Sequence, residues 1–215
     1  MVGKTNFNKR ELQQLLGKMA FITACVRPGH AFSCRLINAL RTCFASPRHQ
    51  LFPVSNVTRE DLVWWKFFLQ HYNGVSVIST AITVSDPELF ACDACLDACG
   101  AVCFGEFFHA KFPPFIASQH LNINQLELLT ILVCLKLWQD RLCGSQVVIL
   151  TDNQVSVNAL NNQRSSSPFM QRCLHELWLL LSLNNICLSA RHISRADTLS
   201  RFHLDSSYSD YVPHA

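Results

Sequence analysis

Four acidic residues in the second half of this 215-residue sequence occupy positions where an α/β sheet could gather them. Asp93 lies within a predicted strand, and Glu127 lies in the first turn of a predicted long helix. Asp152 directly follows an apolar strand, and Asp197 begins the last predicted helix. A carboxylate at the carboxyl end of a buried strand lies on the edge where α/β sheets bind ligands. Asp152 is therefore the strongest functional candidate, whereas a carboxylate in a first turn, such as Glu127, also simply complements the helix dipole.

Carboxylates that converge on a small area repel one another, and a hard cation relieves the repulsion. Mg²⁺ prefers oxygen ligands and retains bound water. Two such ions about 4 Å apart can activate a water molecule and stabilise the leaving oxygen of a phosphodiester. The spacing alone is also compatible with four separate surface carboxylates, so the metal site is a hypothesis at this point.

The elements that must position these carboxylates alternate in type from about residue 88. We predict strands at 88–95, 100–109, 112–118, 146–151 and 186–190, and helices at 123–141, 153–161, 167–184 and 195–203. Gly100 is expected to form the turn between the first two strands. An antiparallel meander followed by helix-linked strands predicts an α/β fold with a mixed five-stranded sheet flanked by helices.

The first third of the chain has a different pattern. Apolar residues recur at helical spacing over 10–24, again before Pro47, and again after Thr58. A run of β-branched residues then ends at Asp86-Pro87, which places a boundary near this point. We predict a small helical unit over 1–74, a linker over 75–87, the α/β domain over 88–203 and a loose polar tail over 204–215.

The charge is unevenly distributed. Residues 1–60 contain nine Lys or Arg and two acidic residues, a net charge of +7, whereas residues 61–215 contain nine and thirteen, a net charge of −4. A basic segment favours a polyanion such as nucleic acid, although a solvated helical surface gives the same composition. With 49% apolar and 15% charged residues, the chain is expected to be globular.

The first residues lack the apolar stretch typical of a signal peptide, and no later apolar run is long enough to predict a membrane span. The 11 cysteines are scattered among apolar neighbours, which favours reduced thiols. We therefore expect an intracellular protein of the cytoplasm or nucleus that is not secreted and has no membrane partner.

Three segments around the candidate carboxylates resemble retroelement ribonuclease H domains. Phe90–Ala101 (FACDACLDACGA) resembles the family's first-strand motif, and Ile123–Leu129 (INQLELL) is similar to the helix that bears its catalytic Glu. Leu150–Asn153 (LTDN) resembles the strand end whose Asp is the third metal ligand. The resemblance implies a ribonuclease H-like fold in which Asp93, Glu127 and Asp152 bind metal.

The terminal segment Ala190–Arg201 (ARHISRADTLSR) resembles a motif of gypsy- and DIRS-type elements in which Ala-Asp-x-Leu-Ser-Arg supplies the fourth carboxylate, here Asp197. The family has a longer stretch before this Asp, whereas only four residues separate His192 from Asp197.

The upstream part of the chain also resembles reverse transcriptases of this kind. The segment from Leu12 to Gly29 looks like the thumb of DIRS-type enzymes, and Asp61–Trp65 (DLVWW) looks like their connection segment. The resemblance thus covers roughly residues 8 to 203. No Tyr-x-Asp-Asp motif of a polymerase palm occurs. The chain is therefore not expected to polymerise, and a separate polymerase portion of the same element is a candidate partner.

The resemblance implies an endonuclease that cleaves the RNA strand of RNA–DNA hybrids. Asp93, Glu127, Asp152 and Asp197 would hold two Mg²⁺ ions, for which Mn²⁺ can substitute. Asn153 and His192 are candidate substrate-binding residues, although Asn153 is equally suited to capping a helix and His192 to a structural role. The alternatives are a catalytically degenerate ribonuclease H-fold module that only binds nucleic acid, and a transposase-like nuclease that cuts duplex DNA.

Two further groups of residues have competing interpretations. The close spacing of four cysteines suggests a zinc site. A strand, a turn and a second strand would however spread these cysteines over both faces of the sheet, which does not suit tetrahedral zinc. We therefore expect buried thiols at Cys92, Cys95, Cys99 and Cys103. The four tryptophans lie in helical apolar patterns, so we expect core positions rather than base-stacking platforms for Trp64, Trp65, Trp138 and Trp178.

Overall fold

The computed structural model describes residues 3–25, 29–47, 49–71, 83–84 and 90–193, and the chain forms two compact units, Met1–Ile78 and Ser79–Ala215. The first unit contains the three helices predicted from the sequence, α1 (Lys9–Cys25), α2 (Gly29–Thr42) and α3 (Asn56–His71). Two short strands that the sequence did not predict, β1 (Asn6–Asn8) and β2 (Leu51–Pro53), pair antiparallel. With three residues each, they are too short to show an alternating pattern.

Aromatic stacking joins α2 to α3 in the first unit. The rings of Phe32 and Trp64 are stacked with centroids 3.4 Å apart, and the ring of Phe68 also stacks with Trp64, with centroids 4.9 Å apart. The indole N–H of Trp65 donates to the main-chain oxygen of Phe32 (3.3 Å). Both tryptophans are buried, as predicted, and so are Trp138 and Trp178 in the second unit.

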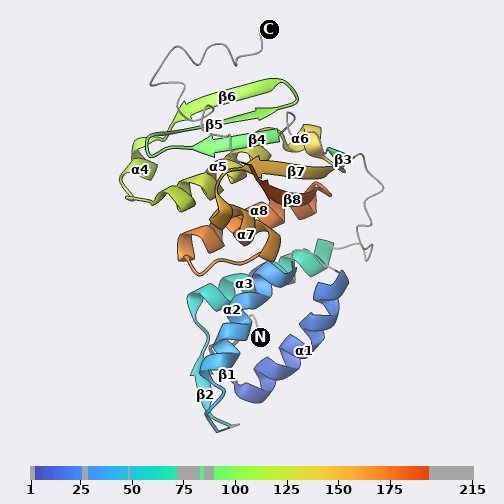
Figure 1. The fold of residues 1–215 in the computed structure, drawn as a ribbon. Coiled ribbons are helices and arrows are strands. Elements are labelled where there is room, and N and C mark those ends of the chain that lie inside the picture. Colours follow the sequence, from blue (N-terminus) through green and yellow to red (C-terminus); the bar gives the residue numbers. More distant parts are fainter. Residues whose placement is uncertain (1–2, 26–28, 48, 72–82, 85–89, 194–215) are drawn as a thin grey trace. The chain divides into compact units, whose positions relative to one another are not determined.

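The second unit is built on one mixed sheet. Its strands are β3 (Thr83–Val84), β4 (Phe90–Ala94), β5 (Ala98–Cys103), β6 (Glu106–Lys111), β7 (Gln146–Thr151) and β8 (Cys187–His192). β6, β5 and β4 form an antiparallel meander, whereas β4, β7 and β8 are parallel. β8 pairs along the whole of one edge of β7, so β3 and β4 share the other edge. The order across the sheet is therefore β6-β5-β4-β7-β8 (Figure 1), which confirms the predicted mixed five-stranded arrangement, and the two-residue β3 beside β7 is an additional, sixth strand.

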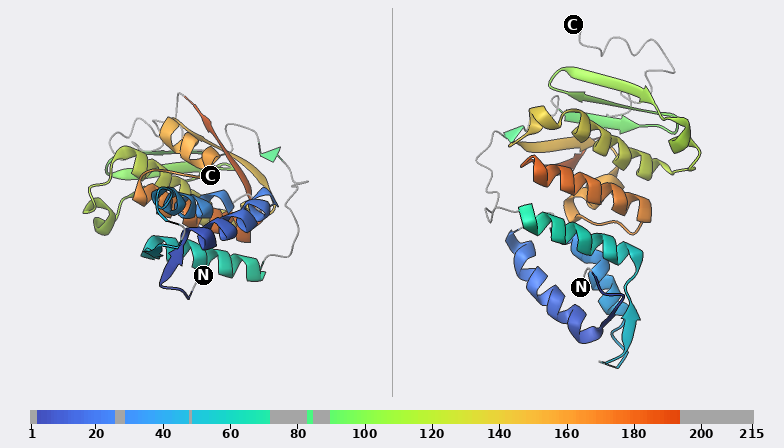
Figure 2. Two further views of the ribbon diagram at one scale, coloured as in Figure 1. Left: turned by 90° about the horizontal axis from the view of Figure 1, so that it is seen from below. Right: turned by 180° about the vertical axis from the view of Figure 1, so that it is seen from behind.

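Helices flank this sheet, as predicted. They are α4 (Pro114–Ala117), α5 (Ile123–Leu137), α6 (Gln139–Leu142), α7 (Gln154–Asn162) and α8 (Pro168–Leu183). α5 lies against β4 and β5, α8 packs against α5 (Figure 2), and α7 contacts β7 and β8. Among the described residues no helix combines the length and apolar character needed to cross a membrane.

The meander differs from the prediction in register. Gly100 does not form a turn but lies within β5, paired with Asp93 on one side and His109 on the other. The β5–β6 turn is instead at Phe104 and Gly105, which both have positive φ (52° and 78°), as a two-residue hairpin turn of type I′ requires. The segment predicted as a strand over 112–118 contains the short helix α4, because Pro113 and Pro114 cannot donate to a ladder but suit a helix start.

The expected linker differs from the structure, and the predicted C-terminal segments are not described by it. Thr83 and Val84, within the expected linker over 75–87, form β3 beside β7. The expected final helix over 195–203 and the tail over 204–215 lie outside the described residues.

The clustered cysteines belong to the core. In the β4–β5 register, Cys92, Cys99 and Cys103 share the sheet face that α5 covers, and all three are buried. A hydrogen bond with Cys134 of α5, together with burial, raises the pKa of Cys92 well above its ordinary value. Burial likewise raises the pKa of Cys99 to about 11. These are protonated core thiols, as expected, but the prediction that the cysteines spread over both faces of the sheet is wrong for these three, and Cys95 is half-buried.

Candidate metal centre

The parallel pairing of β4 and β7 brings two of the predicted carboxylates together. Asp93 is the penultimate residue of β4, and Asp152 directly follows the end of β7. Ala91 and Leu150 are partners in the parallel ladder, so the carboxyl ends of the two strands reach the same edge of the sheet. The predicted position of Asp152 at a strand end is confirmed.

Glu127 arrives at the same edge from α5. The helix begins at Ile123 with a capping box in which Asn122 and Gln125 satisfy each other's main-chain amides, so Glu127 lies beyond the first turn, not within it as expected. Its side chain is only 2% exposed and accepts a hydrogen bond from the main-chain amide of Ala94 (3.3 Å). Glu127 therefore does not serve simply to complement the helix dipole.

The three carboxylates form one cluster. Single ligand oxygens of Asp93, Glu127 and Asp152 all lie within 4.8 Å of one another; Asp93 and Glu127 are buried, and Asp152 is half-buried. Burial raises the pKa of Glu127 to about 9; the carboxylates of Asp93 and Asp152 act in the same direction, whereas the hydrogen bond from Ala94 opposes it. Without a cation, burial and the two neighbouring carboxylates therefore favour the protonated form of Glu127.

The chemistry of this donor set suits a hard divalent cation, because all the ligand atoms are carboxylate oxygens and their mutual repulsion is relieved by positive charge. Within the described ranges this is the only group of three or more His, Cys, Asp or Glu side chains arranged so that they could hold a metal ion. The four clustered cysteines do not form such a group, which fits their interpretation as core thiols.

Of the other predicted site residues, Asn153 and His192 are described by the structure and Asp197 is not. Asn153 caps α7 by accepting from the amide of Ser156 (2.8 Å), and its side-chain amide donates to Asn124 of α5 (2.8 Å). His192 is the last residue of β8, is exposed, and lies opposite Thr151 in the ladder. Asn153 and His192 thus lie at the same sheet edge as the cluster. Asp197 lies outside the described residues.

Two residues near the cluster were missed by the sequence analysis. The hydroxyl of Thr151 lies 3.5 Å from Oε2 of Glu127 and also accepts from the amide of Asn153 (3.2 Å). Asn124 fixes the side chain of Asn153 across the start of α5. Their only local signal was proximity in sequence to Asp152 and Glu127, since hydrogen bonds between different elements leave no periodic pattern.

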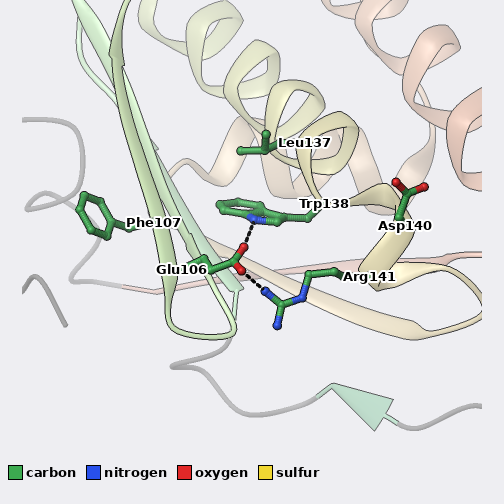
Figure 3. Close-up of a pocket in the computed structure, with 6 residues that line it drawn as sticks. All are labelled: Glu106, Phe107, Leu137, Trp138, Asp140 and Arg141. Atoms are coloured by element: carbon green, nitrogen blue, oxygen red, sulfur yellow. Dashed lines mark hydrogen bonds and ion pairs between the residues drawn. The ribbon is translucent and has the colours of Figure 1, made fainter. Parts of the chain in front are cut away.

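A second acidic group, at the other end of α5, has a different character. A cavity of about 400 Å³ lies between the start of β6 and the junction of α5 and α6, and Glu106 lies at its wall (Figure 3). The carboxylate of Glu106 accepts from the indole of Trp138 (3.0 Å) and pairs with Arg141 (2.6 Å). Because this carboxylate is already neutralised, the cavity is not the candidate metal centre.

Comparison with known proteins shows similarity only to solved structures. No protein-family model and no curated protein matches the chain. Ribonuclease H1 from the halophilic archaeon Halobacterium salinarum NRC-1 is 17% identical, with a TM-score of 0.44 and coverage of 54% of this chain and 96% of that chain. Prototype foamy virus protease-reverse transcriptase is 13% identical (TM-score 0.35), and the foamy viral protease-reverse transcriptase dRH in complex with double-stranded DNA is 14% identical (TM-score 0.33).

The two foamy virus matches cover 86% of this chain but only 24% and 34% of those chains. At these TM-scores the likenesses carry no argument about activity. The expected ribonuclease H-like fold is confirmed by the strand order and directions of the sheet. The expected DIRS-type or gypsy-like origin stays a prediction.

Proposed function

We propose that the second unit is a metal-dependent endonuclease that cleaves the RNA strand of RNA–DNA hybrids. The observation that carries this proposal is the cluster of Asp93, Glu127 and Asp152, whose carboxylate oxygens lie within 4.8 Å at the carboxyl edge of the mixed sheet. The resemblance of the sequence adds Asp197 as a fourth ligand.

Divalent cations such as Mg²⁺, or Mn²⁺ in its place, would supply a water of lowered pKa and positive charge at the leaving oxygen. The chain's own contribution is the position of the ligands. β4 and β7 hold Asp93 and Asp152 at one edge, and the amide of Ala94 fixes the carboxylate of Glu127 beside them. The proton that Glu127 retains in the free protein must leave before its carboxylate can bind a cation.

Substrate recognition would use the backbone and the sugar rather than the base sequence. The 2′-hydroxyl distinguishes the RNA strand from DNA. Asn153 has one side-chain N–H beyond its bond to Asn124, and His192 is exposed at the same edge, so both are suited to contact the substrate backbone. A separate polymerase portion of the same element is a candidate partner for the chain.

The test is cleavage of a labelled RNA–DNA hybrid by the full chain, with Mg²⁺ or Mn²⁺ and with chelator, beside matched RNA and DNA duplexes. We expect metal-dependent cutting of the hybrid's RNA strand only. Asp152→Asn should abolish cleavage while the unfolding transition is retained, and Asp140→Asn, which changes an exposed carboxylate at the far end of α5, should leave cleavage unchanged. Binding without cutting would support the degenerate nucleic-acid-binding module, and cutting of duplex DNA would support the transposase-like alternative.

A further inference from the structure

An apolar cavity lies beside the carboxylate cluster. It has a volume of about 310 Å³, at the small end of the range of roughly 300–1,000 Å³ for ligand pockets. The side chains that line it come from the β4–β5 turn, the segment after β6, α4, the loop into α5 and α5 itself: Leu96, Phe112, Ile116, Ala117, His120, Leu121 and Leu126. None of them is acidic.

Local hydrogen bonds and a small core hold this cavity in shape. The amide of Phe112 donates to the main-chain oxygen of Asp97 (2.9 Å), which ties the end of β6 to the β4–β5 turn. After α4, His120 adopts a positive φ of 48°, and the chain turns into the cap of α5. Phe112, Ile116 and Leu121 pack against the buried side chains of Ala94, Cys99 and Leu126. The cavity is therefore part of the fold.

The cavity shares its supporting elements with the metal centre. Leu96 lies three residues after Asp93, and Leu126 directly precedes Glu127. The hydrogen bond from Ala94 to Glu127 joins the same two elements. A nucleic-acid strand bound at the carboxylates would thus pass close to the cavity.

The cavity beside the metal centre and the cavity at the far end of α5 differ in charge. The cavity at the far end of α5 is lined by Glu106, Asp140 and Arg141. Arg141 pairs with Glu106, so the carboxylate of Asp140 remains to repel a polyanion. The cavity beside the metal centre is lined by apolar side chains and by His120, which is exposed. Leu96, another of the lining residues, is 67% exposed although it is apolar. Apolar walls with an aromatic ring suit the flat face of a nucleobase, which stacks on Phe or His side chains.

We propose that this cavity binds one unstacked nucleobase of the substrate, next to the site of cleavage. The inference rests on the proposed nuclease function and specifies its substrate. A base within a continuous duplex must first be unpaired and unstacked, at a cost of a few kcal/mol, whereas a base in a single-stranded overhang is already exposed. The enzyme therefore prefers hybrids in which the RNA continues as a single strand beyond the duplex.

The test compares three hybrids of equal duplex length: one blunt, one with a short single-stranded RNA overhang, and one whose overhang is abasic. Stacking of one base contributes roughly 1–3 kcal/mol, so the intact overhang should lower KM by about fivefold or more while kcat changes little. The abasic overhang, which keeps the phosphates, should behave like the blunt hybrid. Equal KM values for the intact and abasic overhangs would overturn the proposal.

The variants separate the cavity from the rest of the protein. Leu96→Ser and His120→Asn should remove the advantage of the overhang without changing cleavage of the blunt hybrid, and Asn tolerates the positive φ at position 120. Leu137→Ser is the matched control, because Leu137 is a similarly exposed leucine (56%) at the other end of α5. If Leu96→Ser and Leu137→Ser behave alike, the cavity does not bind the base.

A binding measurement keeps this inference distinct from the nuclease proposal. Fluorescence anisotropy of the labelled overhang hybrid, with metal chelated, reports binding even if no cleavage occurs. If Leu96→Ser binds the hybrid more weakly than Leu137→Ser and the unaltered chain does not cleave it, the cavity binds the base but the chain is not a nuclease. If the unaltered chain cleaves the hybrid and both variants bind it equally well, the chain is a nuclease but the cavity does not bind the base.

Discussion

The carboxylate of Glu127 accepts a hydrogen bond from the main-chain amide of Ala94 at 3.3 Å, and Ala94 directly follows Asp93 in β4. This bond links α5 to β4 at the metal centre and helps to hold two of the three clustered carboxylates side by side. It also places a carboxylate in a buried position next to two others, which explains why the pKa of Glu127 rises to about 9.

Metal binding should release a proton from Glu127. Below pH 9 the metal-free side chain is protonated, and the metal-bound one must be ionised. At pH 7 to 8 we expect release of about one proton per chain, and an apparent Mg²⁺ affinity that rises with pH up to about 9. Titration calorimetry in buffers of different ionisation enthalpy measures this number. Glu127→Gln should release none, and an equal release by both proteins would show that another group supplies the proton.

The buried Asp61 of α3 should make the stability of the first unit depend on pH. Burial raises the pKa of Asp61 from 3.8 to about 7, although Arg35 at 3.2 Å opposes the shift. Between pH 4 and 7 the folded state keeps a proton that the unfolded chain loses. The free energy of unfolding should therefore fall by a few kcal/mol across this window and level off above pH 7.

Urea unfolding of the full chain at several pH values, followed by tryptophan fluorescence, measures this dependence. Asp61→Asn should make the profile shallower between pH 4 and 7, because an amide does not titrate and its oxygen can still accept from Arg35; the slope that remains comes from Glu127 of the second unit. Glu60→Gln, which alters the exposed neighbour that also pairs with Arg35, should leave the slope in place. A profile for the unaltered protein that is flat from pH 4 to 7 would contradict the argument.

Asn161 of α7 should protect the outer edge of β8. Its side-chain amide donates to the oxygen of Ala190 and accepts from the nitrogen of the same residue, both at 3.0 Å. Asn161→Ala leaves both main-chain groups without these bonds, so we expect a loss of about 1–3 kcal/mol of stability. An exposed strand edge also promotes pairing between copies.

Chemical unfolding measures the loss of stability, and light scattering measures the association of copies through the exposed strand edge. Asn162→Ala, at the next and exposed position of α7, is the control and should match the unaltered chain in both measurements. Two variants that behave identically would show that the edge of β8 does not depend on Asn161.

Two glycines of the first unit should respond to alanine in opposite directions. A Cβ at Gly29 would lie 2.7 Å from Thr23 and 2.8 Å from the Trp65 ring, so Gly29→Ala should destabilise the unit by about 1–3 kcal/mol. Nothing lies within 4 Å of a Cβ at Gly17, inside α1, so Gly17→Ala should add up to about 1 kcal/mol. Thermal unfolding of the two variants measures their Tm values. A change of Tm in the same direction for both variants would contradict this packing argument.

The local features of this protein could be predicted from the sequence. Apolar spacing identified α1, α5 and α8, and the apolar run before Asp152 identified β7, because periodicity and strand composition are properties of a single segment. The positions of Asp93 in a strand and Asp152 at a strand end followed from the same patterns. The prediction of a turn at Gly100 was wrong because the position of a turn depends on how the two strands pair. β5 and β6 pair so that the turn lies at Phe104 and Gly105, which both have positive φ.

Only the tertiary structure decided which of these residues act together. Whether Glu127 complements a helix dipole or joins a buried cluster depends on how α5 packs against β4, and sequence spacing does not contain that information. The approach of His192 to the same edge depends on the pairing of β7 with β8. The cavity beside Leu96 likewise exists only where separate elements meet. A sequence determines the chemical types of its residues and their local conformation, whereas distances between elements are set by packing, and those distances determine the chemistry of the site.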